Sequence, residues 1–467
     1  MMQTRPKDTW LFVLLCILIF WAPIPLGSNR VWAVGFLQAG HAALAATLCL
    51  FLAQGKISPS PTLLKSLPSL LLFFAIPCWI ALQLLPLPPD GSPLTLDVSA
   101  SLKSLQTGLW LALLFGVCLQ ILNTPERLRT LALVIIGSGV FEACYAVITI
   151  LGGADFDILA IRSPHWQSGS ATGTYMNRNH LAGYLEMCLS VGTGLMIANI
   201  GNSLPSTNWR ERARSLLHTL LGPKTRQRLL LVSMVIALVM THSRMGNTAF
   251  FAAMGISAGI GFIFFKRRSR SMVLLFGSMI LIDLFIISAW FGLDKLAQRI
   301  EQTPGSREGR LTVNPEAWIW TKEHWLTGSG AGSFTSVFPS YRNQDVIGFY
   351  DYAHNDYLQL LGEYGVLGAA LFAAIALYAL WTSLQAQRER HNSLMQGMAF
   401  GSMMGIICLI IHSSTDFNLH IPANAALLTV LCAIAFISRH MQTQTDSKPR
   451  RRSTPESAPH DATAIQQ

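Results

Sequence analysis

Long apolar stretches recur along the whole chain, and they constrain its fold more than any other feature. A helix needs about 20 mostly apolar residues to cross the hydrocarbon core of a bilayer. Twelve stretches approach or exceed that length, at about 10–26, 31–53, 66–86, 105–122, 128–151, 179–202, 229–242, 246–265, 272–292, 356–384, 395–413 and 421–438. Only 12% of the residues are charged, against about 25% in an ordinary soluble domain. The sequence therefore predicts an all-α polytopic membrane protein with about 12 transmembrane helices.

Lysine and arginine residues indicate how these helices are oriented. Loops that remain in the cytoplasm are enriched in both residue types. If the N-terminus lies inside, the basic segments Arg210–Arg228 and Lys266–Arg270 fall on the cytoplasmic side, together with about two thirds of the 34 basic residues. We therefore expect both termini in the cytoplasm, and the arginines on the outer side call for a separate explanation.

This orientation divides the chain into four parts. Residues 1–292 hold transmembrane helices 1–9, residues 293–355 form one large periplasmic loop, residues 356–438 hold helices 10–12, and residues 439–467 form a tail. The large loop contains the segment Pro315–Leu326, which is typical of a helix, so we expect a short helical subdomain there. The tail is basic and rich in Pro, Ser and Thr, a composition typical of disorder in a cytoplasmic segment that contacts anionic lipid.

Polar clusters mark one membrane face. Five of them interrupt the apolar pattern, at Gly173–His180, His242–Arg244, Ser306–Arg310, His354–Tyr357 and His412–Asn418. They are far apart in sequence, yet the predicted topology places all five on the outer side. This convergence is typical of a functional site at the mouth of a helix bundle.

The residue types in these clusters favour one chemistry. Arginine is always charged and presents a planar fork of donors to phosphate oxygens. A neutral histidine can remove a proton from an attacking hydroxyl. Arginines together with a histidine at an outer membrane face therefore indicate group transfer from a lipid diphosphate.

Several segments also have the form of known signatures. His354–Gly368 fits the pattern HNxYLxxLxExGxxG, Asn177–Gly183 fits NxNHLAG, Ser243–Arg244 forms an SR pair, and Arg310 has the expected spacing to the GxG at Gly328–Gly330. A late motif corresponds to Asp416–Asn424. With these segments the chain resembles the bacterial O-antigen ligase and O-antigen polymerase superfamily, which also includes protein O-oligosaccharyltransferases.

The resemblance implies a specific activity. Members of this superfamily are inner-membrane enzymes that face the periplasm and need neither a metal ion nor another cofactor. They move a glycan from undecaprenyl diphosphate to an acceptor hydroxyl and invert the anomeric centre. The implied partners are this lipid-linked donor, membrane lipid, and an acceptor that is a glycan, lipid A–core or a protein; no nucleic acid is involved. The pathways implied are lipopolysaccharide biosynthesis and exopolysaccharide formation.

The resemblance also implies roles for individual residues. His354 would be the catalytic base, and Arg244 and Arg310 would bind the diphosphate, with Arg307 as a rival for the role of Arg310. Five further residues would line the substrate site: Asn177, Asn179, His180, Asn355 and Asp416. Helix capping is an alternative explanation for Asn177, His180 and Asp416.

Other readings of the sequence stay open. The class of the acceptor separates a ligase, a polymerase and a protein O-oligosaccharyltransferase, and no residue distinguishes them. A transporter or flippase for lipid-linked glycans is the alternative from another class, but it would place charge near the midplane.

Two further motifs have alternative interpretations. Asp155 and Asp157 form a DxD pair that binds a cation in some membrane glycosyltransferases, although we expect no metal here. The glycines of Gly328–Gly332 fit a turn better than a phosphate loop.

Acidic residues also occur inside the predicted helices. Glu142, Glu186 and Asp283 lie within apolar stretches. An ionisable group is costly in lipid, so these side chains should face the interior of the bundle and have polar partners there.

Overall fold

The chain folds into a bundle of helices. The computed structural model describes residues 8–87, 91–152, 169–199, 223–264, 305–343 and 349–443, together with the single residues Leu159 and Gly277. All regular elements in these ranges are helical. The longer helices are α1 (Thr9–Trp21), α2 (Val31–Ala53), α4 (Leu67–Gln83), α5 (Val98–Ile121), α6 (Pro125–Gly152), α7 (Arg178–Ala198), α9 (Pro223–Met240), α10 (Arg244–Phe264), α13 (Gly305–Glu323), α15 (Asp356–Glu389), α16 (Ser393–His412) and α17 (Pro422–His440). The short ones are η1 (Leu26–Ser28), α3 (Pro61–Lys65), α14 (Phe334–Val337), η3 (Phe338–Ser340) and η4 (Asn418–His420).

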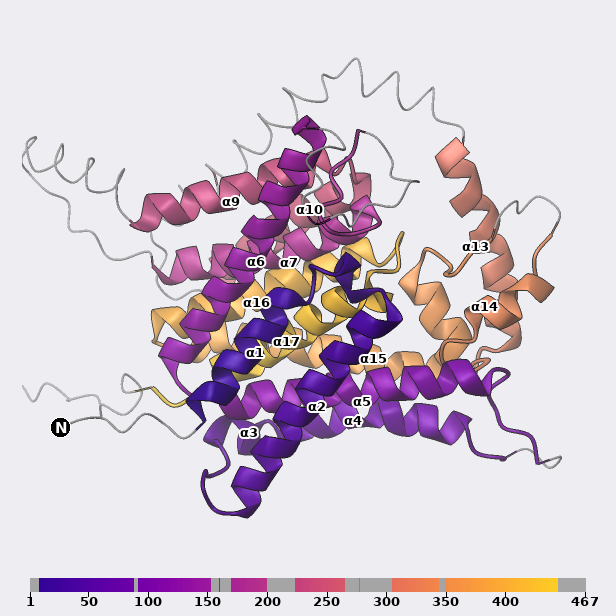
Figure 1. The fold of residues 1–467 in the computed structure, drawn as a ribbon, viewed down its shortest axis with the longest axis horizontal. Helices are drawn as coiled ribbons and strands as arrows, with labels where there is room; N and C mark the ends of the chain where they lie inside the picture. Colours follow the sequence, from indigo (N-terminus) through magenta and orange to yellow (C-terminus); the bar gives the residue numbers. More distant parts are fainter. Residues whose placement is uncertain are drawn as a thin grey trace, which may run out of the picture.

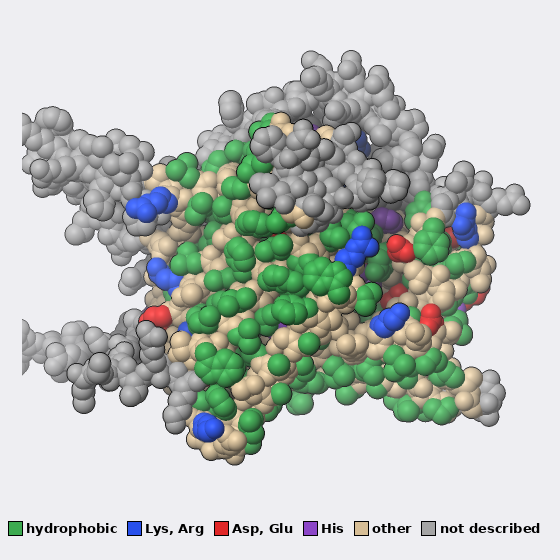
Figure 2. Space-filling model, viewed as in Figure 1, with side chains coloured by type: hydrophobic (Ala, Val, Ile, Leu, Met, Phe, Trp, Pro, Cys, Tyr) green, Lys and Arg blue, Asp and Glu red, His purple; other side chains and the backbone are tan. Residues whose placement is uncertain are grey.

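Helices occupy eleven of the twelve apolar stretches, and the remaining one, 272–292, lies outside the described residues apart from Gly277. Eight of the described helices are long and apolar enough to cross a membrane, and α1 and α4 are shorter apolar helices. In Figure 2, hydrophobic side chains cover the middle of the visible face, and charged side chains gather toward its two ends. The chain is thus a multi-pass membrane protein of the all-α class.

The helices α7, α16 and α17 form the centre of the bundle. In the most apolar window of α7, 94% of the residues are buried, and the values for α16 and α17 are 78% and 83%. Glycines allow α7 and α16 to approach closely, because a Cβ atom on Gly194 would meet the backbone of Gly397 and Gly401. Small residues at such crossings are typical of membrane helix packing.

The two described intramembrane acids face the interior, as the sequence predicts. Glu142 is fully buried and accepts hydrogen bonds from the backbone N–H and the hydroxyl of Thr174, at 3.0 and 2.8 Å. Glu186 of α7 lies 2.9 Å from Nδ1 of His412 of α16, and both side chains are fully buried. Asp283 lies outside the described residues.

The described residues 305–343 and 349–355, which precede α15, pack around its start at one end of the bundle in Figure 1. Its small core consists of Val313, Ala317, Trp320, Phe334, Val337, Phe338 and Ala353. The predicted bounds of its helix, Pro315–Leu326, are wrong: α13 begins at Gly305 and ends at Glu323. Proline is common at the first position of a helix, so Pro315 fits a helix start better than a helix interior. In the structure, Pro315 lies inside α13, where it can make no backbone N–H bond.

A break in α15 creates a short helical segment at this end. Gly365 has φ +64° and ψ −179°, so the helix is interrupted there. The N–H of Val366 donates to the carbonyl oxygen of Trp325 at 2.7 Å, and a Cβ atom on Gly365 would collide with the backbone of Leu326. The break thus fixes the first part of α15 against the loop that follows α13.

Candidate active site

The backbone holds His354 in an unusual conformation directly before α15. His354 has φ +50°, in the left-handed region that a residue with a side chain rarely adopts. Such a conformation costs about 1–3 kcal/mol and persists where its surroundings enforce it. The next residue, Asn355, caps α15, because its side-chain oxygen accepts from the N–H groups of Tyr357 and Leu358 at 3.0 and 3.3 Å. His354 is therefore fixed at the mouth, and its side chain is 25% exposed.

A single buried carboxylate lies beside two histidines. Oδ1 of Asp416, in the turn after α16, lies 3.5 Å from Nε2 of His180 and 3.8 Å from Nδ1 of His354. Burial alone would raise the pKa of Asp416, but the two imidazoles outweigh it and hold the pKa well below its usual range. Asp416 is thus a carboxylate that can orient His354 and stabilise a positive charge on its ring.

The ring of Phe417 lies between these two histidines and a further pair of rings, Tyr352 and His420. It meets the rings of His180 and His354 edge to face, at centroid distances of 4.5 and 4.8 Å. It also stacks on Tyr352 at 4.3 Å, and Tyr352 in turn lies 5.0 Å from the ring of His420. The aromatic contacts fix the ring planes, so the imidazoles cannot rotate freely.

Asp356 anchors the start of α15 to the connection between α16 and α17. Its carboxylate accepts from the hydroxyl of Ser413 at 2.8 Å and lies 3.0 Å from Nδ1 of His420. Its backbone N–H donates to the carbonyl oxygens of Ser413 and Asp416, at 2.9 and 3.2 Å. Asp356 therefore sets the position of His354, two residues earlier, relative to Asp416.

The start of α7 contributes His180 through a hydrogen-bonded frame. Asn177 caps α7, since its side-chain oxygen accepts from the N–H of Asn179 at 2.9 Å. The side chain of Asn424 donates to the carbonyl oxygen of His180 at 3.0 Å and to the side-chain oxygen of Asn418 at 2.9 Å. Side chains from α7, η4 and α17 thus hold His180 against Asp416.

Arg244 begins α10 near the same end. Ser243 caps this helix, because its hydroxyl accepts from the N–H of Gly246 at 3.2 Å. Arg244 is exposed, and its guanidinium has no ion pair or hydrogen bond with any residue that the structure describes. A free arginine at a helix N-terminus, where backbone N–H groups and the helix dipole favour anions, is well placed to bind phosphate.

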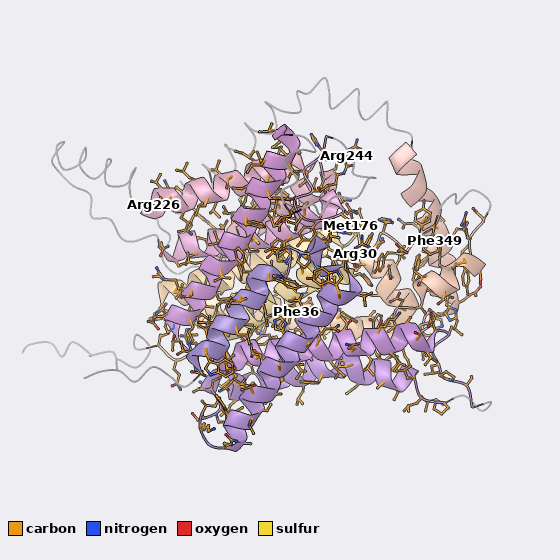
Figure 3. All side chains as sticks on the ribbon, viewed as in Figure 1. Arg30, Phe36, Met176, Arg226, Arg244 and Phe349 are labelled. Atoms are coloured by element: carbon orange, nitrogen blue, oxygen red, sulfur yellow. The ribbon has the colours of Figure 1, made fainter. Side chains whose placement is uncertain are left out.

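Figure 3 shows which labelled residues share an end of the bundle. Arg30, Met176 and Arg244 lie toward the end that carries Phe349, whereas Arg226 lies at the opposite end. The backbone of Arg307 and Arg310 lies in α13, but their side chains are outside the described residues. The structure thus brings His180, His354 and Asp416 together, with Asn177 and Asn355 as the caps of the helices that carry them.

The glycines of Gly328–Gly332 form a turn, as the sequence predicts. The loop contacts a buried acidic side chain of α15: the carboxyl oxygens of Glu363 accept from the backbone N–H groups of Gly332 and Phe334 at 2.9 and 3.3 Å. These two N–H groups therefore pack the loop on α15 and are not available to bind a phosphate.

The described ranges contain no group of three or more His, Cys, Asp or Glu side chains arranged to hold a metal ion. Asp155 and Asp157 lie outside them.

Sequence reasoning assigned no role to Asp356, Phe417, His420 or Asn424. All four lie within segments that resemble family motifs, His354–Gly368 and Asp416–Asn424, so their signal was present. What the sequence lacked was the pairing: Asp356 contacts His420 across 64 positions.

A comparison with protein-family models gives one match. Residues 229–373, about a third of the chain, match the model described as O-antigen ligase. The match supports membership of the chain in the O-antigen ligase superfamily. The matched segment includes Arg244, α13, His354 and the broken part of α15, whereas His180 and Asp416 lie outside it. A comparison with curated proteins finds no significant match.

Proposed function

We propose that this O-antigen ligase family member transfers a glycan from undecaprenyl diphosphate to an acceptor hydroxyl. The reaction would take place at the periplasmic face of the bacterial inner membrane. The observation that carries the proposal is the contact of His354 with the buried carboxylate of Asp416 at the mouth of the bundle. Family membership supports a glycan-transferring enzyme of the ligase type.

In the proposed step His354 acts as the general base. The acceptor oxygen attacks the anomeric carbon from the face opposite the diphosphate, while the acceptor proton passes to the imidazole. The bond between the anomeric carbon and the diphosphate oxygen breaks, and its electron pair leaves with the diphosphate. Asp416 stabilises the imidazolium that forms, in the manner of the carboxylate in a histidine–aspartate pair. Attack from the opposite face inverts the anomeric centre.

Arg244 is the proposed partner of the diphosphate, together with Arg310 or Arg307. The leaving diphosphate gains negative charge in the transition state, and arginine donors that are already in place stabilise this charge. The unpaired guanidinium of Arg244, which contacts no charged group among the described residues, supports this assignment. His180 would hold Asp416 in place, and Asn177, Asn179 and Asn355 would shape the ends of the helices around the donor.

Transfer by the purified full-length protein tests the function. The donor is an undecaprenyl diphosphate-linked glycan, EDTA is present throughout, and the acceptors are lipid A–core, a second lipid-linked repeat unit and a pilin-type protein. We expect an inverted glycosidic product with one acceptor, which assigns the protein as a ligase, a polymerase or a protein transferase. Movement of the donor between liposome leaflets without transfer to any acceptor would contradict the proposal.

A further inference from the structure

Helix α13 carries two apolar faces, and only one of them packs against the described protein. Val313, Ala317 and Trp320, which are spaced as on one side of a helix, are fully buried in the small core beside α15. Trp318 and Ile319 lie away from this core and are 48% and 45% exposed. Although α13 has 19 residues, it is too polar to be one of the candidate membrane spans. Its second apolar face is therefore not the lipid-facing side of a spanning helix.

The second face continues past the end of α13. Lys322 follows Trp318 by one turn, and its ammonium lies 5.6 Å from the centre of the Trp318 ring. In the turn after the helix, Trp325 and Leu326 are 60% and 45% exposed. We call the residues Trp318, Ile319, Lys322, Trp325 and Leu326 the outer face of α13. Tryptophan rings and a lysine among apolar side chains are typical of surfaces at a bilayer interface, where the rings are partly immersed and the ammonium reaches the headgroups.

Two hydrogen bonds on a third side fix the rotation of α13 about its axis. Nδ2 of Asn343 donates to Oε1 of Glu316 at 2.6 Å, and the hydroxyl of Tyr341 donates to Oε2 of Glu323 at 2.5 Å. Together with the buried face, these bonds keep the outer face directed away from the part of the protein that the structure describes.

The outer face is continuous with apolar surface of the bundle. The N–H of Val366 donates to the carbonyl oxygen of Trp325 at 2.7 Å, and the N–H of Leu96 donates to that of Ser329 at 2.8 Å. Leu96, Val366 and Leu367 are themselves exposed, and the last two belong to α15, a candidate membrane span. The lipid that surrounds α15 therefore borders the outer face directly.

The direction of α13 is that of a helix on a membrane surface. In Figure 1, α4 and α5 run along the bundle, whereas α13 runs across this direction at the end of the bundle. Because α5 is a candidate span, a helix that lies across it follows the plane of the membrane. An amphipathic helix in this orientation buries its apolar face about 5–10 Å into the boundary between headgroups and acyl chains.

We propose that the outer face of α13 inserts into the bilayer leaflet on the side of the mouth, with its apolar side chains among the upper acyl chains and Lys322 at the lipid phosphates. The same helix contains Arg307 and Arg310. The insertion therefore holds these two residues at the depth where a lipid-linked donor carries its diphosphate. This consequence rests on the proposed function, whereas the insertion itself does not.

Tryptophan fluorescence of the full-length protein in nanodiscs tests the insertion. The difference in emission between the wild type and the double variant Trp318→Phe, Trp325→Phe reports these two rings, and Trp320→Phe, on the buried face of the same helix, is the control. We expect phosphatidylcholine with bromine near the headgroup end of its acyl chains to remove at least half of the difference emission, and to act more strongly than acrylamide in the water phase. The Trp320 emission should respond to neither quencher.

Two results would overturn the insertion. Stronger quenching of the difference emission by acrylamide than by brominated lipid would place the outer face in water. Protection from both quenchers would show that another protein surface, such as a second copy of this chain, covers it. The measurement needs no transfer, so it remains decisive even if the protein does not use the proposed donor.

Ile319→Asp tests the consequence for the donor. A carboxylate in the outer face is costly in lipid, so it should lift α13 from the leaflet. We expect the KM for an undecaprenyl diphosphate-linked donor in nanodiscs to rise about tenfold, while the KM for a donor with a short, water-soluble isoprenoid stays at its wild-type value. Ser340→Asp adds the same charge at an exposed polar residue near α13 and should change neither KM. An equal rise of both KM values, or an unchanged KM for the long donor in a folded Ile319→Asp protein, would refute this positioning role.

Discussion

Among the histidine–carboxylate pairs in the described part of the chain, two lie in contrasting surroundings. In the bundle interior, His412 and Glu186 lie 2.9 Å apart, and neither side chain is exposed. At the mouth, His354 and Asp416 lie 3.8 Å apart, Asp416 is shared with His180, and His354 is 25% exposed. The interior pair joins α7 to α16 and is fully buried, whereas the mouth pair has a partly exposed imidazole. Exposure and pairing distance therefore distinguish the interior pair from the mouth pair, which we propose to be catalytic.

The largest expected effect comes from breaking the mouth pair. His354→Ala removes the proposed base, and general-base catalysis typically contributes about 10²–10⁴-fold to a rate. We therefore expect kcat to fall by about that factor, while the midpoint of thermal unfolding stays unchanged. Initial rates of transfer and thermal unfolding in the same detergent measure both quantities. A large fall in the unfolding midpoint would show that His354 is a structural residue like His412.

Breaking the interior pair should give the opposite result. Glu186→Leu leaves His412 buried without its partner, and the loss of one member of a buried pair costs about 3–5 kcal/mol. We expect a lower thermal midpoint, with a normal rate for the protein that stays folded. The double variant Glu186→Leu, His412→Leu should recover most of the stability, because apolar side chains can replace both. Failure of the second substitution to restore stability would contradict a simple pair.

A substitution at Arg244 tests whether the planar shape of the guanidinium matters at the mouth, in addition to its positive charge. Arg244→Lys keeps the charge but loses the planar fork, so we expect kcat/KM for the donor to fall about tenfold, which corresponds to about 1.4 kcal/mol. Arg226→Lys is the matched control, since Arg226 lies at the opposite end of the bundle (Figure 3). Equal effects of both substitutions would show that only overall charge matters.

The smallest effect concerns the pH response of Asp416. Its pKa is held below the usual range, so its carboxylate stays ionised throughout neutral and mildly acidic pH. Asp416→Asn should therefore lower kcat by a similar factor, about tenfold or about 1.4 kcal/mol, at every pH between about 5 and 8. Rate–pH profiles of both proteins measure this factor. A loss that grows steeply across this range would show that Asp416 itself titrates there.

The sequence predicted the helices better than the pairing between them. Hydrophobic length alone located the apolar stretches, because a bilayer demands it of any spanning helix. The predicted start of the loop helix at Pro315 was wrong, since proline marks a helix start more often than it lies within a helix. The break at Gly365 was hidden because glycine is also frequent in straight membrane helices.

For the site, the motifs alone group His354, Asn177 and Asp416 into one set. They could not show that Asp416 lies between two histidines, because this contact depends on how the turn after α16 meets the starts of α7 and α15. The partnership of Asp356 with His420 was missed for the same reason: each residue looks like an ordinary helix-end residue until the two ends are adjacent.

Chemical rescue of His354→Ala tests the role of this histidine most directly. Removal of the side chain leaves a space at the partly exposed mouth, where free imidazole can replace the lost base. We predict that transfer by the variant is slow and rises in proportion to the concentration of neutral imidazole, with no such response in the wild-type protein or in Arg244→Ala. Transfer by His354→Ala at the wild-type rate without imidazole would contradict the assignment of His354 as the base.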